Sequence, residues 1–512
     1  MQISDHSLRQ LDDAYLERLE EKALRSLSGR LLADLKAARE RLNQNSQNSS
    51  RPPSSQAPWE RPAPPAPSAA AEAEEEDPNE TTPGWDPDAA AQRSLPEAGV
   101  ESKGRAGKRK GAVGVGRAAP DRVDRRESHE PETCAGCREC LGEVTGSVYT
   151  GYYEVDWVRV EGGWHVCWTQ HQWYEKACRC GHVTRAVPWR ERVEGTDLGG
   201  FRLIGPGLAS LIVALALRYR LSRPRIRAFL GEWLGVRLSV GAIHTVIDEV
   251  GELMAPVEAE LIEAVQESGL LHADETPWPE QGAPALSLWL WVFTTAQVTL
   301  YYISHRGQEL VQTLLENFAG RLMSDGWQAY RWLARRLRCW AHLKRKAVGL
   351  VESYHREAQA FGGDVLDLWK GLYEAVQKAR EGPPQSLRED FEDRLHTFRA
   401  RCEALRASSH SKTRDLAGEF LNDWEAIFAV LDHPHWPLTN NEAERALRHW
   451  VILRKLTHGT RTEQGSRRLA LLASVIDTCY QRGHSPWGYL HTAVTVRRQG
   501  LPLPPLPSAV GG

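Results

Sequence analysis

The chain has 512 residues, of which 41% are hydrophobic and 26% are charged, a composition typical of a soluble globular protein with several domains. Its longest apolar run, LASLIVALAL at 208–217, is too short to span a bilayer, so we expect a cytoplasmic protein without a membrane contact. The net charge of −3 balances an acidic run at 72–77 against basic stretches elsewhere, and therefore does not exclude nucleic acid as a partner.

The first predicted element is a helix from residue 8 to about 43, rich in Leu, Glu, Arg and Ala. Its apolar positions from Leu31 to Leu42 follow a 4-3-4 spacing, which suits a short coiled coil and hence self-association. From 44 to 130, Asn, Ser, Pro and charged residues replace the helix formers. Such a composition cannot bury enough apolar surface to offset chain entropy, so we expect a mostly disordered linker.

Residues 131–185 contain short alternating runs that suit small strands, together with two close cysteine pairs. Cys134 and Cys137 form a C-x-x-C pair, and Cys178 and Cys180 form a C-x-C pair. In a reducing compartment such pairs indicate metal ligation, and four thiolates are a usual ligand set of structural Zn²⁺. The same segment also holds spare candidate ligands: Cys140, His165, Cys167 and His182.

Residues 186–265 are predicted to be helical. Two amphipathic helices at roughly 224–250 flank the segment GVRLS, with Gly235 as a stop signal and Ser239 as an N-cap. This is the layout of a helix-turn-helix. The same pattern is also ordinary helix packing, and the second helix carries more acid than base, so groove reading and packing both stay open.

After residue 268 the pattern changes to strands. The segments SGLLHADET, LSLWLWVFTT and VTLYYISH are short and apolar, and they predict a meander of three strands. A helix over GQELVQTLLENF, a strand over GRLMSDGWQAY, a basic helix and a last strand in LRCWAHLKRKAVGL follow. This order is that of the ribonuclease-H-like α/β fold, here with a helical insertion at 351–430.

Carboxylates stand at three matching places in this predicted fold. Asp274 and Asp325 each end a strand, and Glu444 lies in the first turns of a helix that Thr439 or Asn440 can cap. Phosphodiester cleavage uses two divalent ions about 4 Å apart, and hard ions such as Mg²⁺ take carboxylate ligands. Each acid alone is more simply a turn residue or a solvated ion pair. The three together, in this order, favour a catalytic metal site.

Six segments carry a family resemblance: RLNQNSQNSSRPPSS, HADETPW, SDGWQAY, CWAHLKRK, NNEAERALR and GSRRLALLASVIDTCYQRGHSPWGYL. They resemble signatures of the IS66 family of insertion-sequence transposases. The resemblance implies a DDE recombinase that cleaves DNA at the ends of its element and transfers the freed 3′ end to target DNA. It implies Asp274, Asp325 and Glu444 as the triad, with Mg²⁺ or Mn²⁺, and it supports the same four cysteines as structural Zn²⁺ ligands.

Physical reasoning gives these acids roles. Asp274 would bridge two ions, while Asp325 and Glu444 would each hold one. We place Glu275 and Glu442 outside the ligand set.

Basic residues around the acids are predicted to contact the DNA backbone. They are Lys344, Arg345, Lys346, Arg445, Arg448, Arg454 and Lys455. His342 lies among them, and is either a further contact or a packed or exposed histidine without a chemical role.

The expected partners are DNA, as element terminal repeats and as target, further copies of the chain, and accessory proteins of the same element, in the bacterial cytoplasm near the nucleoid. One alternative is a catalytically inactive DNA-binding or scaffolding protein derived from a transposase. Another is a structure-selective nuclease on the same fold.

The expected fold class is multidomain α/β, with a ribonuclease-H-like catalytic domain that contains a helical insertion. The predicted segments are an N-terminal leucine-rich helix (1–43), a linker (44–130), a zinc-binding module (131–185), a helix-turn-helix-like domain (186–265), the first part of the catalytic core (266–350), the helical insertion (351–430), the second part of the core (431–485) and a C-terminal tail (486–512).

Overall fold

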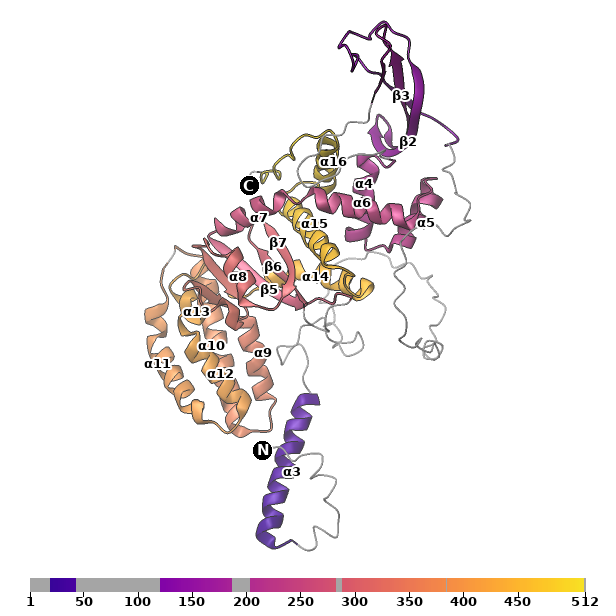
Figure 1. Ribbon diagram of the computed structural model, residues 1–512. Coiled ribbons are helices and arrows are strands. Elements are labelled where there is room, and N and C mark those ends of the chain that lie inside the picture. The colour runs from indigo at the N-terminus through magenta and orange to yellow at the C-terminus, as the bar shows by residue number, and fades with distance from the viewer. Residues whose placement is uncertain (1–18, 43–119, 187–202, 282–287, 384, 511–512) are drawn as a thin grey trace. The chain divides into compact units, whose positions relative to one another are not determined.

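The computed structural model describes residues 19–42, 120–186, 203–281, 288–383 and 385–510 (Figure 1). All of them belong to one unit of the chain, Met1–Gln56 with Pro120–Gly512. Most of the predicted linker, residues 44–119, lies outside the described residues, as does the start of the N-terminal helix. Among the described residues, no helix is both long and apolar enough to cross a bilayer.

The predicted N-terminal helix is present as α3 (Glu21–Leu42). Its leucines at 31 and 35 are 36% and 53% exposed, so this part of the apolar seam is open to solvent. An exposed seam of this kind suits pairing with another helix. The coiled coil itself stays a prediction.

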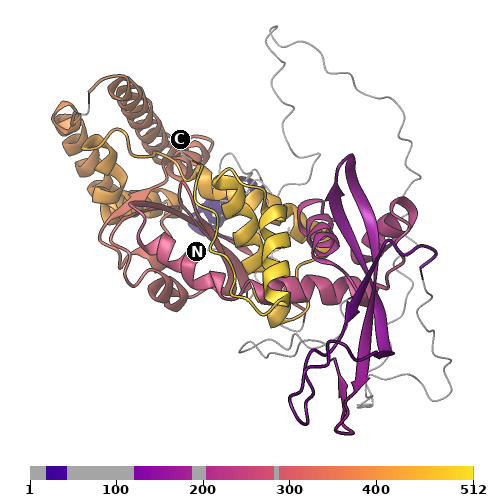
Figure 2. The ribbon, with the colours of Figure 1, turned by 90° about the horizontal axis from the view of Figure 1, so that it is seen from above.

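The cysteine-rich region forms a sheet around a long hairpin, whose two strands stand out in purple in Figure 2. The hairpin strands are antiparallel, and β1 pairs with β3 in parallel. The predicted strands are thus confirmed and are longer than expected. The four strands are β1 (Arg125–His129), β2 (Ser147–Val160), β3 (Gly163–Ala177) and β4 (Val183–Arg185).

The prediction that the linker extends to residue 130 is wrong at its end, because residues 125–129 form β1. The sequence RRESH has no apolar periodicity, so nothing local marks it as a strand. Its order comes from pairing with β3 about 44 residues along the chain, where Arg125 aligns with Thr169 and His129 with Trp173. The His129 ring also stacks on Trp173, with 4.0 Å between ring centroids.

The hairpin joins the next helix, α4 (Pro206–Val213), through Asp156 on β2. The helix begins after Gly205, which offers no side-chain cap. Instead, Asp156 Oδ1 accepts the backbone N–H of Leu208 at 2.8 Å, and so takes the place of an N-cap. A Cβ on Gly207 would lie only 2.0 Å from the Trp157 carbonyl oxygen, so glycine is needed for this close approach.

We predict that Asp156→Ala lowers the free energy of unfolding by about 1 kcal/mol, the usual cost of losing an N-cap acceptor. Asp156→Asn keeps the accepting oxygen and is expected to lose less. Chemical denaturation of the two variants and the wild type measures the difference. Equal stability of all three would show that the bond to Leu208 contributes nothing.

Helices α4 to α7 confirm the predicted helical segment. The helix-turn-helix layout is present: Gly235 has a φ of +65°, and the Ser239 side chain accepts the N–H of Ala242 at 3.0 Å. The second helix, α6, packs on α4 and on α15 (Glu463–Gln481), which supports its packing role. After α4 the helices are η4 (Ala214–Arg218), a π-helical turn, then α5 (Arg223–Trp233), α6 (Val240–Leu253) and α7 (Val257–Gln266).

A second sheet of five strands has the order β7-β6-β5-β8-β9. The predicted meander is confirmed, because β5, β6 and β7 are consecutive antiparallel neighbours, whereas β8 and β9 add in parallel beside β5. Helix α8 (Gln308–Leu314) connects β7 to β8. The strands are β5 (Leu270–Pro277), β6 (Leu288–Thr294), β7 (Thr299–His305), β8 (Arg321–Ser324) and β9 (Arg336–Arg338).

The predicted order near β9 is wrong in one respect. Residues 331–335, expected to be a basic helix, form turns after the short 3-10 helix η5 (Gln328–Tyr330). The predicted last strand is present as β9, at the start of the segment LRCWAHLKRKAVGL, and the basic helix follows it as α9 (Trp340–Val351). Its buried positions, Trp340, Leu343, Ala347 and Leu350, have helical spacing, and this period outweighs the apolar start of the segment.

The predicted insertion is helical, as expected, and has a core of its own that includes Phe361, Leu372 and Phe420. Helix α9 packs against its first helix. The helices of the insertion are α10 (Arg356–Arg380), α11 (Arg388–Ala404), α12 (Ser411–Asn422) and α13 (Trp424–Phe428), with the 3-10 turns η6 (Leu405–Ala407) and η7 (Ala429–Leu431).

The chain then returns to the sheet. Helices α14 (Asn441–Thr457) and α15 contact its strands, and α15 lies along β7 (Figure 1). The segment 486–512, expected to be a tail, contains a helix, α16 (Pro486–Arg498). Tyr489, Leu490 and Val494 of α16 are buried, and the helix packs on α4.

Candidate functional site

Three acidic side chains from distant segments come together beside two inner strands of the five-stranded sheet, β5 and β8. Asp325 directly follows β8, as expected, whereas the expectation that Asp274 ends its strand is wrong, because β5 continues from it to Pro277. These two strands are parallel neighbours in which His272 aligns with Met323, so two residues further on Asp274 comes opposite Asp325. Glu444 stands in the first turn of α14. All three predicted carboxylates are therefore in one neighbourhood.

The charges of this group repel one another. The pKa of Asp274 lies well above its usual range, first because of burial and then because Asp325, Glu275 and Glu444 are close. Asp274 accepts the N–H of Glu275 at 3.0 Å, and Asp325 accepts that of Trp327 at 2.9 Å. Within the described parts of the chain, neither aspartate has an ion-pair partner. A cation bound there would offset this repulsion.

Glu275, which we expect to lie outside the ligand set, differs from the two aspartates in having partners within the protein. Its side chain is only 2% exposed and forms an ion pair with Arg306 at 2.7 Å. The Tyr330 hydroxyl donates to it at 3.3 Å. Burial, together with Asp325, raises its pKa to about 7. Its charge is therefore neutralised by the protein itself.

Glu444 has three polar neighbours. Cys339, His342 and Glu444 have ligand atoms within 4.8 Å of one another, and the Arg345 guanidinium is 3.4 Å from the Glu444 carboxylate. Burial, followed by the charge of Arg345, lowers the pKa of His342 to about 3, so the imidazole is neutral. Sequence reasoning left the place of His342 open and did not consider Cys339. The signal for both was C-x-x-H spacing at a helix start.

Asn440 holds these segments together. It is fully buried at the N-cap position of α14, but its side chain makes no cap bond. Its Nδ2 donates to the Ala273 carbonyl at 2.8 Å, and its Oδ1 lies 3.1 Å from His272 Nδ1. Its backbone N–H donates to Cys339 Sγ at 3.2 Å. One residue thus joins β5, the end of β9 and the helix that carries Glu444.

We predict that Asn440→Ala lowers the free energy of unfolding by about 1–3 kcal/mol, because the Ala273 carbonyl and His272 lose their buried partner. The matched control is Asn441→Ala, which removes the same side chain from the exposed neighbouring position. Chemical denaturation compares the two variants. Equal losses would contradict the special role of Asn440.

The Asp-Gly pair after β8 has a structural reason beyond a simple turn. Gly326 has a φ of +94°, and a Cβ there would lie 1.4 Å from Arg338 Nη1. The Arg338 side chain is 2% exposed and pairs with Glu419 and Asp423 of the insertion. Glycine therefore lets a buried arginine pass directly beside Asp325.

The predicted DNA-binding residues divide into two groups. Lys344, Arg448 and Lys455 are exposed, and Arg445 is exposed in an ion pair at 3.1 Å with Glu442, which is itself exposed. The other three are engaged within the protein: Arg345 with Glu444, Lys346 with Glu419, and Arg454 with Thr276 and the Pro277 carbonyl.

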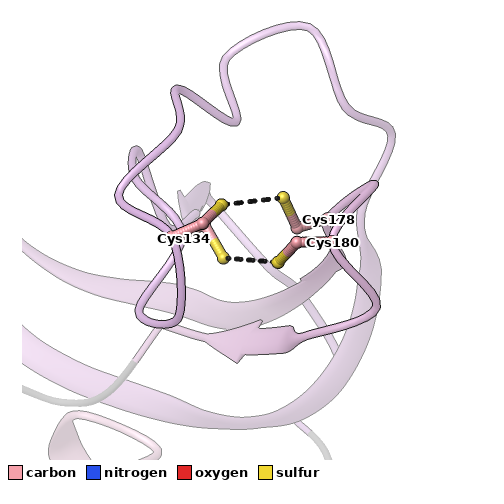
Figure 3. A group of neighbouring side chains, drawn as sticks. Cys134, Cys178 and Cys180 are labelled. Carbon is pink, nitrogen blue, oxygen red and sulfur yellow. Dashed lines mark hydrogen bonds between the residues drawn. The ribbon is translucent and has the colours of Figure 1, made fainter.

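The four predicted cysteines form a second candidate site (Figure 3). The Sγ atoms of Cys134 and Cys180 are 3.7 Å apart, and those of Cys137 and Cys178 are 3.5 Å apart. Metal–sulfur bonds of about 2.3 Å in a tetrahedron place sulfur atoms about 3.8 Å apart, so the group can hold a metal. The backbone amide of Cys137 lowers the pKa of Cys134 to about 6, which favours its thiolate form.

Each cysteine pair lies in a tight turn that aims its sulfurs inward. Arg138 and Gly181 follow the two pairs with φ of +63° and +86°. The N–H of Arg138 donates to the Cys134 carbonyl, and that of Gly181 to the Cys178 carbonyl. The spare candidate ligands stay outside the four-cysteine group: Cys140, His165, Cys167 and His182.

We predict that Asp274→Asn stabilises the protein by about 1 kcal/mol or more at pH 7 in a chelator, because it removes a buried charge that Asp325 repels. The raised pKa means that the native state binds more protons than the unfolded chain above the ordinary value of 3.8. Wild-type stability then falls as the pH rises through this region, and the variant lacks this fall.

Chemical denaturation of Asp274→Asn across pH, with and without Mg²⁺, checks this. Mg²⁺ should stabilise the wild type more than the variant, because the ion offsets the same charge. Glu442→Gln, at an exposed carboxylate, is the control. A variant less stable than the wild type in chelator at pH 7 would contradict the charge argument.

A cluster of unpaired carboxylates beside exposed cations, on a mixed sheet, is the kind of site found in enzymes that process nucleic acids. The comparison with known families agrees. Residues 202–468, more than half of the chain, match the family described as Transposase IS66 family, and the chain belongs to this family. A second match, over residues 5–84, is to a family of unknown function, DUF6444.

Curated relatives come from Sinorhizobium fredii (strain NBRC 101917 / NGR234). Uncharacterized protein y4qI is 26% identical over 297 residues, which cover 52% of this chain and 55% of that protein. Uncharacterized protein y4jO is 28% identical over 172 residues, which cover 33% of this chain and 52% of that protein. The chain thus spans about half the length of the curated relatives it matches.

Proposed function

We propose that this protein is a DDE-type DNA transposase that cleaves phosphodiester bonds at the ends of an insertion element and joins the freed 3′ ends to target DNA. The observation that carries the proposal is the convergence of Asp274, Asp325 and Glu444, with both aspartates lacking a cationic partner among the described residues. Membership of the IS66 transposase family supports the same role.

The sheet supports a ribonuclease-H-like catalytic domain. An antiparallel meander followed by two parallel strands gives the order β7-β6-β5-β8-β9, and the first and fourth strands in sequence each deliver an aspartate. The helical insertion α10 to α13 lies in sequence between the second and the third acid. It would be the interruption that separates the two parts of such a domain.

The donor set suits Mg²⁺ or Mn²⁺, which prefer carboxylate oxygens. Divalent ions bound there would stabilise the charge that develops on the phosphate and activate the attacking oxygen. In this assignment Asp274, Asp325 and Glu444 would hold the ions together, because Asp325 and Glu444 both lie close enough to Asp274 to raise its pKa. Arg345 holds the Glu444 side chain in place through their ion pair. The neutral His342 beside Glu444 can accept a hydrogen bond.

Substrate DNA would contact the exposed cations near the acids. Lys344 on α9 and both Arg448 and Lys455 on α14 are exposed, whereas Arg454 is engaged by Thr276. Each phosphate contact of this kind contributes about one unit to the slope of log affinity against log salt. The full set proposed for the DNA backbone remains Lys344, Arg345, Lys346, Arg445, Arg448, Arg454 and Lys455.

The four-cysteine group would hold a structural Zn²⁺. Its sulfur separations fit a tetrahedral thiolate site with no open position. Self-association through α3 would bring two element ends together, and accessory proteins of the same element are further proposed partners. Each is a part of the transposase assignment that can be tested separately.

We expect purified wild-type protein to cleave DNA fragments that carry the ends of its element, and to transfer them to a second duplex, only with Mg²⁺ or Mn²⁺. Asp274→Asn, Asp325→Asn and Glu444→Gln should each reduce product formation by at least about 100-fold, beyond the usual loss for residues outside a metal's ligand set. Gel analysis of labelled DNA measures both products.

Glu442→Gln is the matched control, because it changes a carboxylate two residues from Glu444 that faces solvent. It should retain cleavage. Full activity of Asp325→Asn would remove that residue from the site and with it the triad. Binding of the ends without any product, even with accessory proteins present, would favour a catalytically inactive DNA-binding protein derived from a transposase.

A further inference from the structure

The sheet of the cysteine-rich region carries a second cluster of metal-ligating side chains, away from the four cysteines. Glu127 and His129 come from β1, and His171 comes from β3. Glu127 aligns directly with His171 in the parallel ladder, and His129 lies two residues further along β1. Residues with this spacing share one face of a sheet, so all three side chains point the same way.

The ligand atoms of this cluster converge. His129 Nε2 lies 3.0 Å from His171 Nδ1, and a carboxylate oxygen of Glu127 lies 3.4 Å from the same nitrogen. All three ligand atoms are within 4.8 Å of one another. Metal–nitrogen bonds of about 2.0–2.1 Å in a tetrahedron put two nitrogens about 3.3 Å apart. The observed separations match this requirement closely.

The two imidazoles are held in these orientations by aromatic neighbours. The His129 ring stacks on Trp173 at 4.0 Å between centroids, and the His171 ring stacks on Tyr152 at 4.7 Å. The rings therefore need little rearrangement to receive an ion.

We propose that Glu127, His129 and His171 form a transition-metal site that binds Zn²⁺ separately from the four cysteines. Two histidines and a carboxylate are a ligand set that zinc accepts, and three protein ligands leave one position open. Glu127 is 54% exposed, so an ion can reach the site from solvent.

The site would fasten β1 to the hairpin. The strand RRESH has no apolar side chain to bury, and four of its five residues are exposed. Two of its side chains and one from β3 would bind the same ion, which links the strands as a cross-link does. In the four-cysteine group, Cys178 directly follows β3. The same sheet would therefore carry two metal sites of different chemistry.

The test is the number of Zn²⁺ ions bound per full-length chain, measured by elemental analysis after equilibration with Zn²⁺ in excess Mg²⁺, which occupies the carboxylate site. His171→Asn should bind one equivalent fewer than the wild type. Glu127→Gln, at an exposed position, should weaken the same equivalent by about 10-fold or more. The matched control is His165→Asn, an exposed histidine on the same strand, which should bind as the wild type does.

Substitution with Co²⁺ separates folding from binding, because thiolate ligands give intense charge-transfer absorption that nitrogen and oxygen ligands lack. A His171→Asn variant that keeps the thiolate bands but loses one equivalent has a folded module without the histidine site. If His171→Asn loses both the thiolate bands and the Zn²⁺ equivalent, its module is not folded, and the result for Glu127→Gln then decides. Wild-type stoichiometry and affinity in Glu127→Gln and His171→Asn, or loss of an equivalent in His165→Asn as well, would overturn the proposal.

Discussion

The buried amide of Asn440 is the contact on which the acidic site depends. Its side chain binds the backbone of β5 one residue before Asp274, and its own backbone binds Cys339 at the end of β9. The helix that begins there reaches Glu444 one turn later. A buried polar group is tolerated only when its hydrogen bonds are satisfied. The arrangement of the three segments that satisfies Asn440 is therefore favoured over others.

The charged side chains around the two aspartates are paired with one another, so the repulsion is confined to Asp274 and Asp325. Glu275 is neutralised by Arg306, while Asp423 and Glu419 of the insertion take up Arg336, Arg338 and Lys346. Basic side chains close to the acids are thereby engaged with other carboxylates. Burial, followed by repulsion from Asp325, raises the pKa of Asp274, and a divalent cation bound there would offset this repulsion.

The sequence could predict what local patterns determine. The meander, the Ser239 cap, the two cysteine pairs and the two strands at Asp274 and Asp325 all have short-range signals. Pairing over long distances has none: β1 is a strand because of β3, and Asn440 serves β5 about 167 residues away instead of capping its own helix. Helix α9 was missed for another reason, because the strand β9 at the start of its segment is followed at once by a helical period that begins at Trp340.

The small apolar core around the four cysteines is a physical reason to expect a metal there. Around the cysteines the buried apolar cluster consists of Cys134, Leu141 and Cys178, and two of these are themselves proposed ligands. So small a core cannot offset the entropy of ordering two tight turns. The free energy of metal binding would then be folding free energy for this end of the sheet. At Asp156, in contrast, the hairpin is anchored to α4 by a hydrogen bond within the protein and needs no ion.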